Sequence, residues 1–386
     1  MVLGYLLARA GLTVTVLEKH ADFLRDFRGD TIHPSTIALL RELGLGEEFL
    51  ALPLSRLETV DAVIDGSRLT VADFSTLPEP ETFLVFAPQW DFLDFLAAQG
   101  GKLPGFDLRM STEATDLIVE HGRVVGVRAR GPEGDLDVRA PLTVAADGRD
   151  SVLRARAGLH PVSTGVPIDV LWFRLPKPRH APPPTLGYVS PGGLVVTLDR
   201  DDYYQVGAII PKGRAQALRD RGLDSFRAGL VAVAPHLASV IDSLASWDQV
   251  KLLSVQIDRL RTWHRPDFIA IGDAAHAMSP MFGVGVNYAI QVAVALANAI
   301  HDDLARGEAP DDVLAAVQRR RERPARTMQR LQRIGHRGLA HIVHATGERA
   351  VPRGLVTLLS ILSPRFRPRV ASFIGLGLLP EHSTIR

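Results

Sequence analysis

The sequence predicts an α/β fold that is interrupted by an α+β sheet domain and followed by a helical C-terminus. Three observations lead to this prediction. The chain opens with a helix, a glycine and an apolar strand that ends in Glu18. Two further apolar strands, at 142–146 and 268–271, each end beside an acidic residue and a glycine. Between them lie segments of alternating apolar and polar residues, which are typical of antiparallel sheets.

The first element has the pattern of a nucleotide-binding unit. Met1–Ala10 is expected to be helical, with Gly11 as its C-terminal stop. Thr13–Leu17 (TVTVL) then predicts a buried parallel strand that ends in Glu18. Helix, glycine, strand and terminal acid form the second half of a dinucleotide-binding βαβ unit, in which the acid accepts hydrogen bonds from a ribose.

The following segments lead from this unit into antiparallel structure and back. Arg28 lies in a predicted loop, and Pro34 begins an amphipathic helix that ends at Gly44. Residues 59–86 alternate apolar and polar positions between turn signals, so we expect antiparallel hairpins. A helix from Gln89 to about Ala98 then returns to the first domain.

The strand at Leu142–Ala146 is followed by Asp147-Gly148 and a helix over Ser151–Ala157. An Asp-Gly pair alone is usually just a turn. The run DGRDSVLR after a buried strand is more specific, because it places a carboxylate at the strand's carboxyl end. Open α/β proteins bind their ligands at that edge of the sheet.

Residues 158–254 change in character and are predicted to form an α+β insertion. Prolines cluster near its start, and strands are expected at LWFRL, LGYVS, LVVTL and YYQVGAII. Helices are expected near Phe226–Ala234 and Leu237–Leu244. We expect the sheet to form a wall against a ligand held by the other domain, while its aromatic residues are individually ordinary sheet packing.

The stretch from Asp267 to Ile300 combines every feature of a ligand-binding corner. A short apolar strand, Phe268–Ile271, ends at Gly272-Asp273, and an Ala-rich helix is predicted from about Asn287. Such an arrangement brings a carboxylate and the positive end of a helix beside one ligand. The turn between them contains Pro280, Gly283 and Gly285.

The C-terminal part is predicted to be helical. The arginine-rich run within Asp311–Arg333 is expected to be a solvated face. Leu355–Leu362 and Ser372–Leu379 are predicted to be docked amphipathic helices, with membrane contact as a minority alternative. No apolar run reaches the ~20 residues of a membrane span.

Composition excludes several classes of function. Forty-four basic and 43 acidic residues give a net charge of +1, so we expect no nucleic-acid partner. The absence of cysteine removes disulfides and thiolate metal sites, and it fits a cytoplasmic protein. The sequence contains no zinc-ligand spacing and no P-loop, and it leaves an oligomeric state open.

These motifs together resemble those of the flavin-dependent aromatic hydroxylases of the para-hydroxybenzoate hydroxylase type. The resemblance implies a Rossmann-like FAD-binding domain in which Asp273 holds the ribityl chain and the glycine turn and following helix lie under the flavin ring. It also implies that Arg28 lies near the flavin and the pyrophosphate, and that Asp147-Gly148 lies between FAD and a transient nicotinamide site. The cofactor-binding residues expected on this basis are Glu18, Arg28, Gln89, Asp147, Gly148, Gly272, Asp273, Pro280, Gly283, Gly285 and Asn287.

The resemblance also implies a division of the chain into three parts. Residues 1–58, 87–157 and 255–345 would form a discontinuous FAD-binding domain. Residues 59–86 and 158–254 would form a substrate-binding sheet domain, and 346–386 a C-terminal helical segment.

The implied activity is that of an FAD-dependent monooxygenase. Such an enzyme uses NAD(P)H and O2 to hydroxylate a small aromatic or polyketide-like molecule through a flavin C4a-hydroperoxide. One alternative is another flavin enzyme of the same fold, such as a reductase, a dehydrogenase or a halogenase. For a halogenase a Trp-x-Trp motif is expected, whereas all four tryptophans of this chain are isolated. A second alternative is a non-catalytic chain that has lost FAD.

Two departures from the family pattern are visible. The G-x-G-x-x-G loop and the strand before it should precede the first helix, and neither is present. We therefore expect the native product to have about 10–15 more residues, one strand plus its turn. The family also commonly has an acidic residue where this chain has Val292.

Overall fold

The computed structural model describes residues 1–24, 31–182, 187–200, 202–344, 347 and 349–385. The parallel strands of the predicted nucleotide-binding part form two separate pairs. β1 (Val14–Leu17) pairs in parallel with β7 (Phe106–Arg109). β11 (Thr143–Ala145) pairs in parallel with β20 (Phe268–Ala270), which also pairs with the short antiparallel strand β19 (His264–Arg265).

Helices pack on these strands to form the largest hydrophobic core. α1 (Val2–Arg9) lies against α9 (Gly285–Ala305) and α4 (Gln89–Gly100). Gly4 allows α1 to approach β1, because an added Cβ would lie 2.7 Å from Cγ2 of Val16. The predicted helix, glycine stop and strand are therefore confirmed, with Gly11 at φ 85°.

The prediction that the first strand is buried was wrong. All four residues of β1 are only partly buried. Within the described part of the chain β1 has a single neighbour, β7, so its other edge is not covered by a strand. The half-burial follows directly, because a strand is enclosed only when both of its edges and both of its faces are covered.

A second sheet of seven strands forms the other half of the molecule, in the order β17-β13-β16-β15-β14-β4-β5. The parallel pair of β14 and β4 joins segments that are far apart in the sequence. The strands are β4 (Thr59–Ile64), β5 (Ser67–Asp73), β13 (Ile168–Pro176), β14 (Gly187–Ser190), β15 (Gly193–Asp199), β16 (Tyr203–Pro211) and β17 (Lys251–Leu253).

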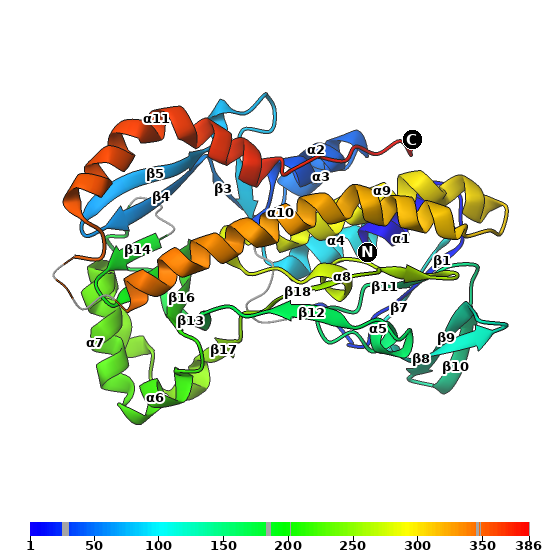
Figure 1. The fold of residues 1–386 in the computed structure, drawn as a ribbon, viewed down its shortest axis with the longest axis horizontal. Helices are drawn as coiled ribbons and strands as arrows, with labels where there is room; N and C mark the ends of the chain where they lie inside the picture. The colour runs from blue at the N-terminus through cyan, green and yellow to red at the C-terminus, as the bar shows by residue number, and fades with distance from the viewer. Residues whose placement is uncertain (25–30, 183–186, 201, 345–346, 348, 386) are drawn as a thin grey trace.

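Alternation along β13 shows how this sheet is covered. Leu171 and Phe173 point into a core shared with α7 (Leu223–Val233). Val170 points into a different cluster that contains Val343, at the end of α10 (Asp311–Val343). The sheet is therefore covered by α7 on one face and by the end of α10 on the other, as Figure 1 shows.

Two local predictions in this half need correction. The hairpin expected within 59–86 is formed by β4 and β5, whereas β6 (Leu84–Phe86) pairs with β2 (Thr31–Ile32) and β3 (Ser55–Leu57). Leu84 and Phe86 pack in the cluster with Met278 and Leu198, and Val85 packs in the largest core. The helix expected at 237–244 is replaced by 3₁₀ turns at Pro235–Leu237 and Ile241–Ser243. A segment this short gains little from helix formation, and the turns already bury its apolar side chains.

The remaining elements are short and lie around these two sheets. The strands β8 (Glu113–Glu120), β9 (Arg123–Gly131) and β10 (Gly134–Arg139) form an antiparallel sheet, and β12 (Pro161–Thr164) pairs with β18 (Ile257–Leu260). The short helices are α2 (Pro34–Glu42), α3 (Gly46–Leu50), α5 (Val152–Arg156), α6 (Ala215–Asp220) and α8 (Asp273–His276).

α10 runs along the length of the molecule and contacts both halves (Figure 1). The interpretation of its arginine run as a solvated face holds for several residues, but it is wrong for Arg321, which is 2% exposed. Its Nη1 donates to Oε1 of Glu381 at 2.9 Å and to the carbonyl oxygen of Leu379 at 2.6 Å. The ion pair therefore fixes the C-terminal segment to the core.

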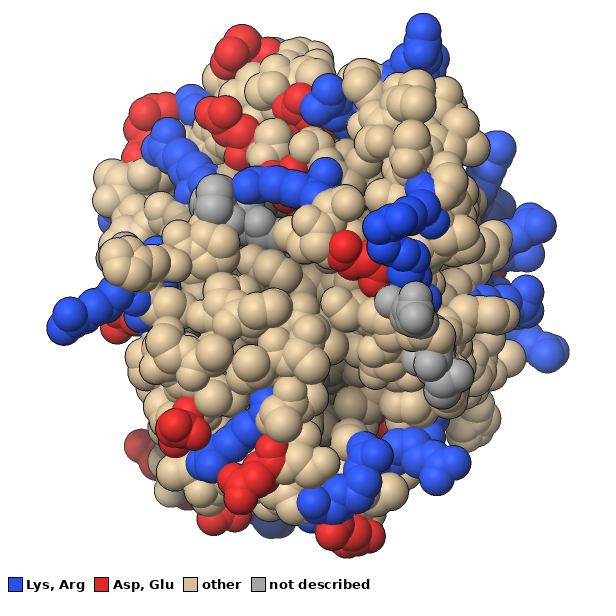
Figure 2. Space-filling model, turned by 90° about the vertical axis from the view of Figure 1, so that its left-hand side faces the viewer, with Lys and Arg blue, Asp and Glu red and all other residues tan. Residues whose placement is uncertain are grey.

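The two helices expected after residue 354 form one helix, α11 (Arg353–Gly375). Its second half is docked through Ala371 and Ile374, which are buried. The first half is not docked as predicted, since Leu355, Leu358 and Ile361 are exposed. Figure 2 shows this end of the molecule, where charged side chains of both signs surround a broad uncharged centre.

Among the described residues, one helical stretch, Met281–Ala305, is long and apolar enough to cross a membrane by composition; it comprises a 3₁₀ turn (Met281–Gly283) and α9. Sixty-seven per cent of its most apolar window is buried in the protein, as in the core helix of an α/β protein. Its apolar surface therefore packs against α1 and the rest of the core.

The buried ion pair gives the first prediction. Glu381→Leu leaves the buried guanidinium of Arg321 unpaired, so the free energy of unfolding should fall by about 3–5 kcal/mol in urea denaturation. The double variant with Arg321→Met should recover most of that loss. Glu47→Gln, which breaks an exposed pair with Arg41, should cost about 0.5 kcal/mol or less. Equal losses for Glu381→Leu and Glu47→Gln would contradict this account.

Candidate functional site

Two acidic turns meet at the carboxyl ends of β11 and β20. The parallel register pairs Ala145 with Ala270, so Asp147 and Asp273 follow neighbouring strands at the same edge. Gly272 lies between β20 and Asp273 at φ 57°, ψ −140°, a conformation that L side chains rarely adopt. The sequence-predicted residues Asp147, Gly148, Gly272 and Asp273 are thus brought together.

Two arginines, which sequence reasoning did not single out, hold this corner. Nε of Arg149 donates to Oδ2 of Asp273 at 3.2 Å, and its Nη2 donates to the carbonyl oxygen of Met278 at 3.1 Å. Arg154 is buried and donates to the carbonyl oxygens of Ala274 and Arg149. The run DGRDSVLR contained both residues, but nothing in it indicated contacts more than 100 residues away.

The carboxylate of Asp147 caps the start of α5. It accepts hydrogen bonds from the hydroxyl of Ser151 and from the backbone N–H of Leu153, at the start of α5. Gly148 has φ 86° and open space where a Cβ would lie. Asp147 itself is exposed.

A second acid, Asp258 on β18, lies beside the same corner and was also missed. It is 7% exposed, and its Oδ1 accepts a long 3.4 Å hydrogen bond from the N–H of Ala277. Burial raises the pKa of Asp258, the nearby Arg154 and Arg149 lower it, and Asp273 raises it. Its place inside a short strand gave no sequence signal of this environment.

The turn after Asp273 is fixed by close backbone packing. Gly283 has φ 64°, and a Cβ there would lie 2.8 Å from Oγ1 of Thr31. Nε2 of His33 donates to the carbonyl oxygen of Gly283 at 3.1 Å. His33 was expected to be only a helix-entry residue; it does stand at the N-cap of α2, but it is also fully buried against this turn.

The helix after the turn begins at Gly285, two residues before the predicted start. Its first N–H groups have no partner within the helix, and they give this end a partial positive charge. Asn287 is buried, and its Oδ1 accepts hydrogen bonds from Ser35 at 2.7 Å and Thr36 at 3.0 Å. Asn287 therefore joins α9 to α2.

A part-exposed strip follows the turn between the two acids and the helix. Pro280, Met281, Gly283 and Gly285 are partly exposed, and Phe282 is 41% exposed. Phe282 also has φ 70°, which is strained for a bulky residue. Strain of this kind persists only where the surroundings impose it, and it is frequent at ligand sites.

The other predicted residues, Glu18, Arg28 and Gln89, come earlier in the sequence. Glu18 follows β1 and accepts from the N–H of His20, and its charge acts on the amino group of Met1 at the start of α1. Gln89 is the first residue of α4 and is partly buried. Arg28 lies outside the described residues.

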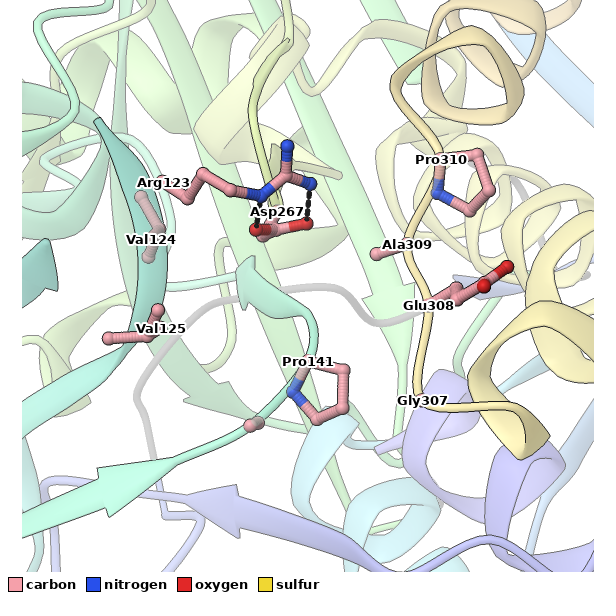
Figure 3. Close-up of a pocket in the computed structure, with 10 residues that line it drawn as sticks. Arg123, Val124, Val125, Pro141, Asp267, Gly307, Glu308, Ala309 and Pro310 are labelled. Atoms are coloured by element: carbon pink, nitrogen blue, oxygen red, sulfur yellow. Dashed lines mark hydrogen bonds and ion pairs between the residues drawn. The ribbon is translucent and has the colours of Figure 1, made fainter. Parts of the chain in front are cut away.

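A separate pocket of about 380 Å³ lies at the opposite edge of the parallel strands. Pro141 and Asp267, which precede β11 and β20, line it together with the loop Gly307–Pro310 (Figure 3). Arg123 forms a two-pronged ion pair with Asp267 in this pocket. Since ligands of open α/β sheets bind at the carboxyl ends of strands, this pocket is not the expected site. Among the described residues, no cluster of His, Asp and Glu could hold a metal ion.

Comparison with known proteins decides the family. The model of the FAD binding domain family matches residues 1–332. The chain belongs to this family of FAD-dependent monooxygenases. It is 32% identical over 336 residues to the 6-methylpretetramide 4-monooxygenase of Streptomyces rimosus, covering 86% of this chain and 80% of that protein.

Solved structures show the same fold. The OxyS anhydrotetracycline hydroxylase of Streptomyces rimosus superimposes with a TM-score of 0.75 at 22% identity, covering 98% of this chain and 74% of that one. The myxobacterial chondrochloren halogenase CndH has a TM-score of 0.77 at 19% identity, covering 99% and 91%. The expected α/β fold with a sheet domain and a helical C-terminus is confirmed.

The residues present fit a flavin. A cofactor ring can approach the backbone at Gly285, where nothing lies within 4 Å of the place that a Cβ would take. The side chain of Asp273 is 36% exposed, so its carboxylate keeps acceptor capacity beyond the Arg149 contact. The strip between Asp273 and α9 is partly exposed to solvent. The N-terminus of α9 beside it adds positive potential.

The burial of His33 gives a pH prediction. Burial lowers the pKa of His33 to about 4, while its hydrogen bonds to the backbone raise it. An unfolded histidine titrates near 6.5, so the unfolded state takes up the proton first as the pH falls. The free energy of unfolding should therefore decline between about pH 6.5 and 4, with His33 contributing a slope of about 1.4 kcal/mol per pH unit in that range.

Urea denaturation at several pH values tests this contribution. His33→Gln should keep a donor for Gly283 and lose the slope due to this group. His160→Gln, at an exposed position, is the matched control and should leave the slope unchanged. An unaltered slope in His33→Gln would refute the assignment.

Proposed function

We propose that this FAD-dependent monooxygenase uses NAD(P)H and O2 to hydroxylate a small aromatic or polyketide-like molecule. The observation that supports it most is the corner formed by Asp147 and Asp273 beside the start of α9. The names of the relatives support the substrate class, since they refer to 6-methylpretetramide and anhydrotetracycline. The balanced reaction converts substrate, O2, NAD(P)H and a proton to hydroxylated substrate, water and NAD(P)⁺.

We assign the parts of FAD to residues along the carboxyl edge of the strands. Asp273 would accept a ribityl hydroxyl, with Gln89 beside the same chain. Glu18 would accept hydrogen bonds from the adenosine ribose, and Arg28 would lie near the pyrophosphate. The remaining assigned contacts are Asp147, Gly148, Gly272, Pro280, Gly283, Gly285 and Asn287, the last through its backbone because its side chain is used by α2.

Bound FAD supplies the two-electron chemistry with NAD(P)H and oxygen. The chain's own residues would have three tasks in the reaction. The positive end of α9 would stabilise negative charge at the flavin edge, with an effect equivalent to about half a unit charge. Met281 and Phe282, on the part-exposed strip, would keep water away from the reacting atoms. Asp147-Gly148 would lie between FAD and a transient nicotinamide.

We propose that the substrate binds between this strip and the seven-stranded sheet. Met278 from the turn, Phe86 from β6 and Leu198 from β15 belong to one apolar cluster where the two halves meet. An apolar wall with few polar groups suits an aromatic molecule. The requirement for NAD(P)H and the absence of cysteine suit the cytoplasm.

A halogenase is the second candidate, because CndH shares the fold at a TM-score of 0.77. Fold alone does not decide between these chemistries. The four tryptophans, Trp90, Trp172, Trp247 and Trp263, are isolated in the sequence, so a Trp-x-Trp pair is absent. Chloride-dependent product formation would favour the halogenase.

FAD binding tests the assignment of Asp273. Asp273→Ala removes a charged acceptor worth about 1.5–3 kcal/mol, so the Kd for FAD should rise about 10–100-fold in a fluorescence titration. Asp303→Ala, which removes an ion pair at the far end of α9, should bind FAD like the unaltered protein. Equal Kd values for the three proteins would remove Asp273 from the site.

Product analysis tests the reaction class. With a panel of phenols and polycyclic phenols, at least one compound should stimulate NAD(P)H oxidation and gain one oxygen atom from ¹⁸O2, measured by mass spectrometry. Peroxide formation with every compound, and no labelled product, would contradict the hydroxylase proposal.

A further inference from the structure

α10 presents a row of buried polar side chains to the turn that follows Asp273. Gln329, Gln332 and His336 are 4%, 0% and 1% exposed. Their spacing of three and four residues places them on one face of the helix. Such residues are costly in a core unless each finds a partner, so their contacts indicate what the row is for.

Gln332 uses both ends of its amide on one short segment. Its Oε1 accepts from the N–H of Ser279 at 3.1 Å. Its Nε2 donates to the carbonyl oxygens of Ser279 at 3.0 Å and Met281 at 2.9 Å. One side chain thus satisfies three backbone groups of an irregular turn.

His336 acts on the same turn through a serine. Its Nε2 lies 2.7 Å from Oγ of Ser279, and that hydroxyl oxygen accepts from the N–H of Met281 at 3.1 Å. Gly335, between the two polar residues, lies so close to the turn that a Cβ would be 2.7 Å from Sδ of Met281.

Gln329 extends the row toward Asp258. Its Nε2 donates to the carbonyl oxygens of Asp258 at 2.7 Å and Ala277 at 3.0 Å, and its Oε1 accepts from Arg259 at 3.0 Å. Side chains of α10 therefore hydrogen-bond to backbone groups of Ala277, Ser279 and Met281, within the segment from Ala277 to Met281. It has no regular secondary structure before Met281 that could hold it instead.

This segment lies where the two halves of the molecule meet. Asp273 and Arg149 fix its beginning, since Arg149 bonds to the carbonyl oxygen of Met278. The turn continues from this segment to Gly283, whose carbonyl oxygen accepts a hydrogen bond from His33. Met278 packs with Phe86 and Leu198 on the side of the seven-stranded sheet. Any displacement here shifts both the proposed flavin surface and the proposed substrate wall.

We propose that Gln332 and His336 are positioning residues for the monooxygenase reaction: they fix the turn 277–283 so that Pro280 to Gly283 present their backbone to the flavin ring. The inference rests on the proposed FAD site and adds residues that touch neither cofactor nor substrate. A turn without these bonds would leave the ring's hydrogen-bonding environment variable, and that environment sets flavin potential and colour.

The same helix offers a matched control. Gln318 is also a buried glutamine of α10, and it also joins a backbone N–H and a carbonyl oxygen, those of Trp263 and Arg261. Its target lies before β20 rather than after it. Gln318→Leu therefore removes the same chemical groups from the same helix without touching the turn.

The experiment compares Gln332→Leu with Gln318→Leu. In the cofactor-free proteins, amide hydrogen exchange within 277–283 should be at least tenfold faster in Gln332→Leu only. In the FAD-loaded proteins, the flavin midpoint potential and visible spectrum should change in Gln332→Leu and not in Gln318→Leu. Gln332→Glu, which keeps an acceptor and loses the donor, should give an intermediate exchange rate.

Two outcomes separate this inference from the proposed function. If FAD binds and both leucine variants match the unaltered protein in exchange, potential and spectrum, the positioning role is overturned. If the unaltered protein does not bind FAD, the proposed function fails, while the exchange result still reports on the turn. Should Gln332→Leu not fold, His336→Phe must show the same changes and His336→Gln must reverse them; an unchanged His336→Phe overturns the inference.

Discussion

The parallel pairing of β11 with β20 is the constraint on which the rest of the site depends. It places two acidic turns at one edge of the sheet, where Arg149 and Arg154 bond them to each other. The turn that follows Asp273 can then reach α9, because β20 ends at a fixed point beside it. With that register shifted by one residue, the strand's side chains would change faces and Asp273 would leave the edge.

Much of this corner could be predicted from the sequence because its signals are local. An apolar strand, an acid, a glycine with positive φ and a helix start lie within a few residues of one another, as at Phe268–Asp273. The contacts that hold the corner are not local. Arg149 and Asp273 are 124 residues apart, and Gln332 and Ser279 are 53 apart. A polar residue on a charged helix looks solvated until its tertiary partner is known, which is why Arg321 and Gln332 escaped notice.

The site also shows why a shared fold leaves the reaction open. A hydroxylase and a halogenase superimpose on this chain with similar TM-scores. What they share with this chain is the fold, and fold alone does not decide the reaction. In the proposed site, the substrate side is the apolar cluster of Met278, Phe86 and Leu198 beside the turn. Gln332 and His336 of α10 hydrogen-bond to the turn that carries Met278, so the proposed positioning role would act on this cluster through α10.

Amide hydrogen exchange of the protein with and without FAD tests the central claim most directly. The claim is that the carboxyl edge of β11 and β20, together with the start of α9, forms the cofactor site. It predicts that FAD slows exchange at 147–151 and 272–287 and leaves the loop 307–310, at the opposite edge, unchanged. Protection at 307–310 without protection at 272–287 would place the flavin elsewhere and contradict the account.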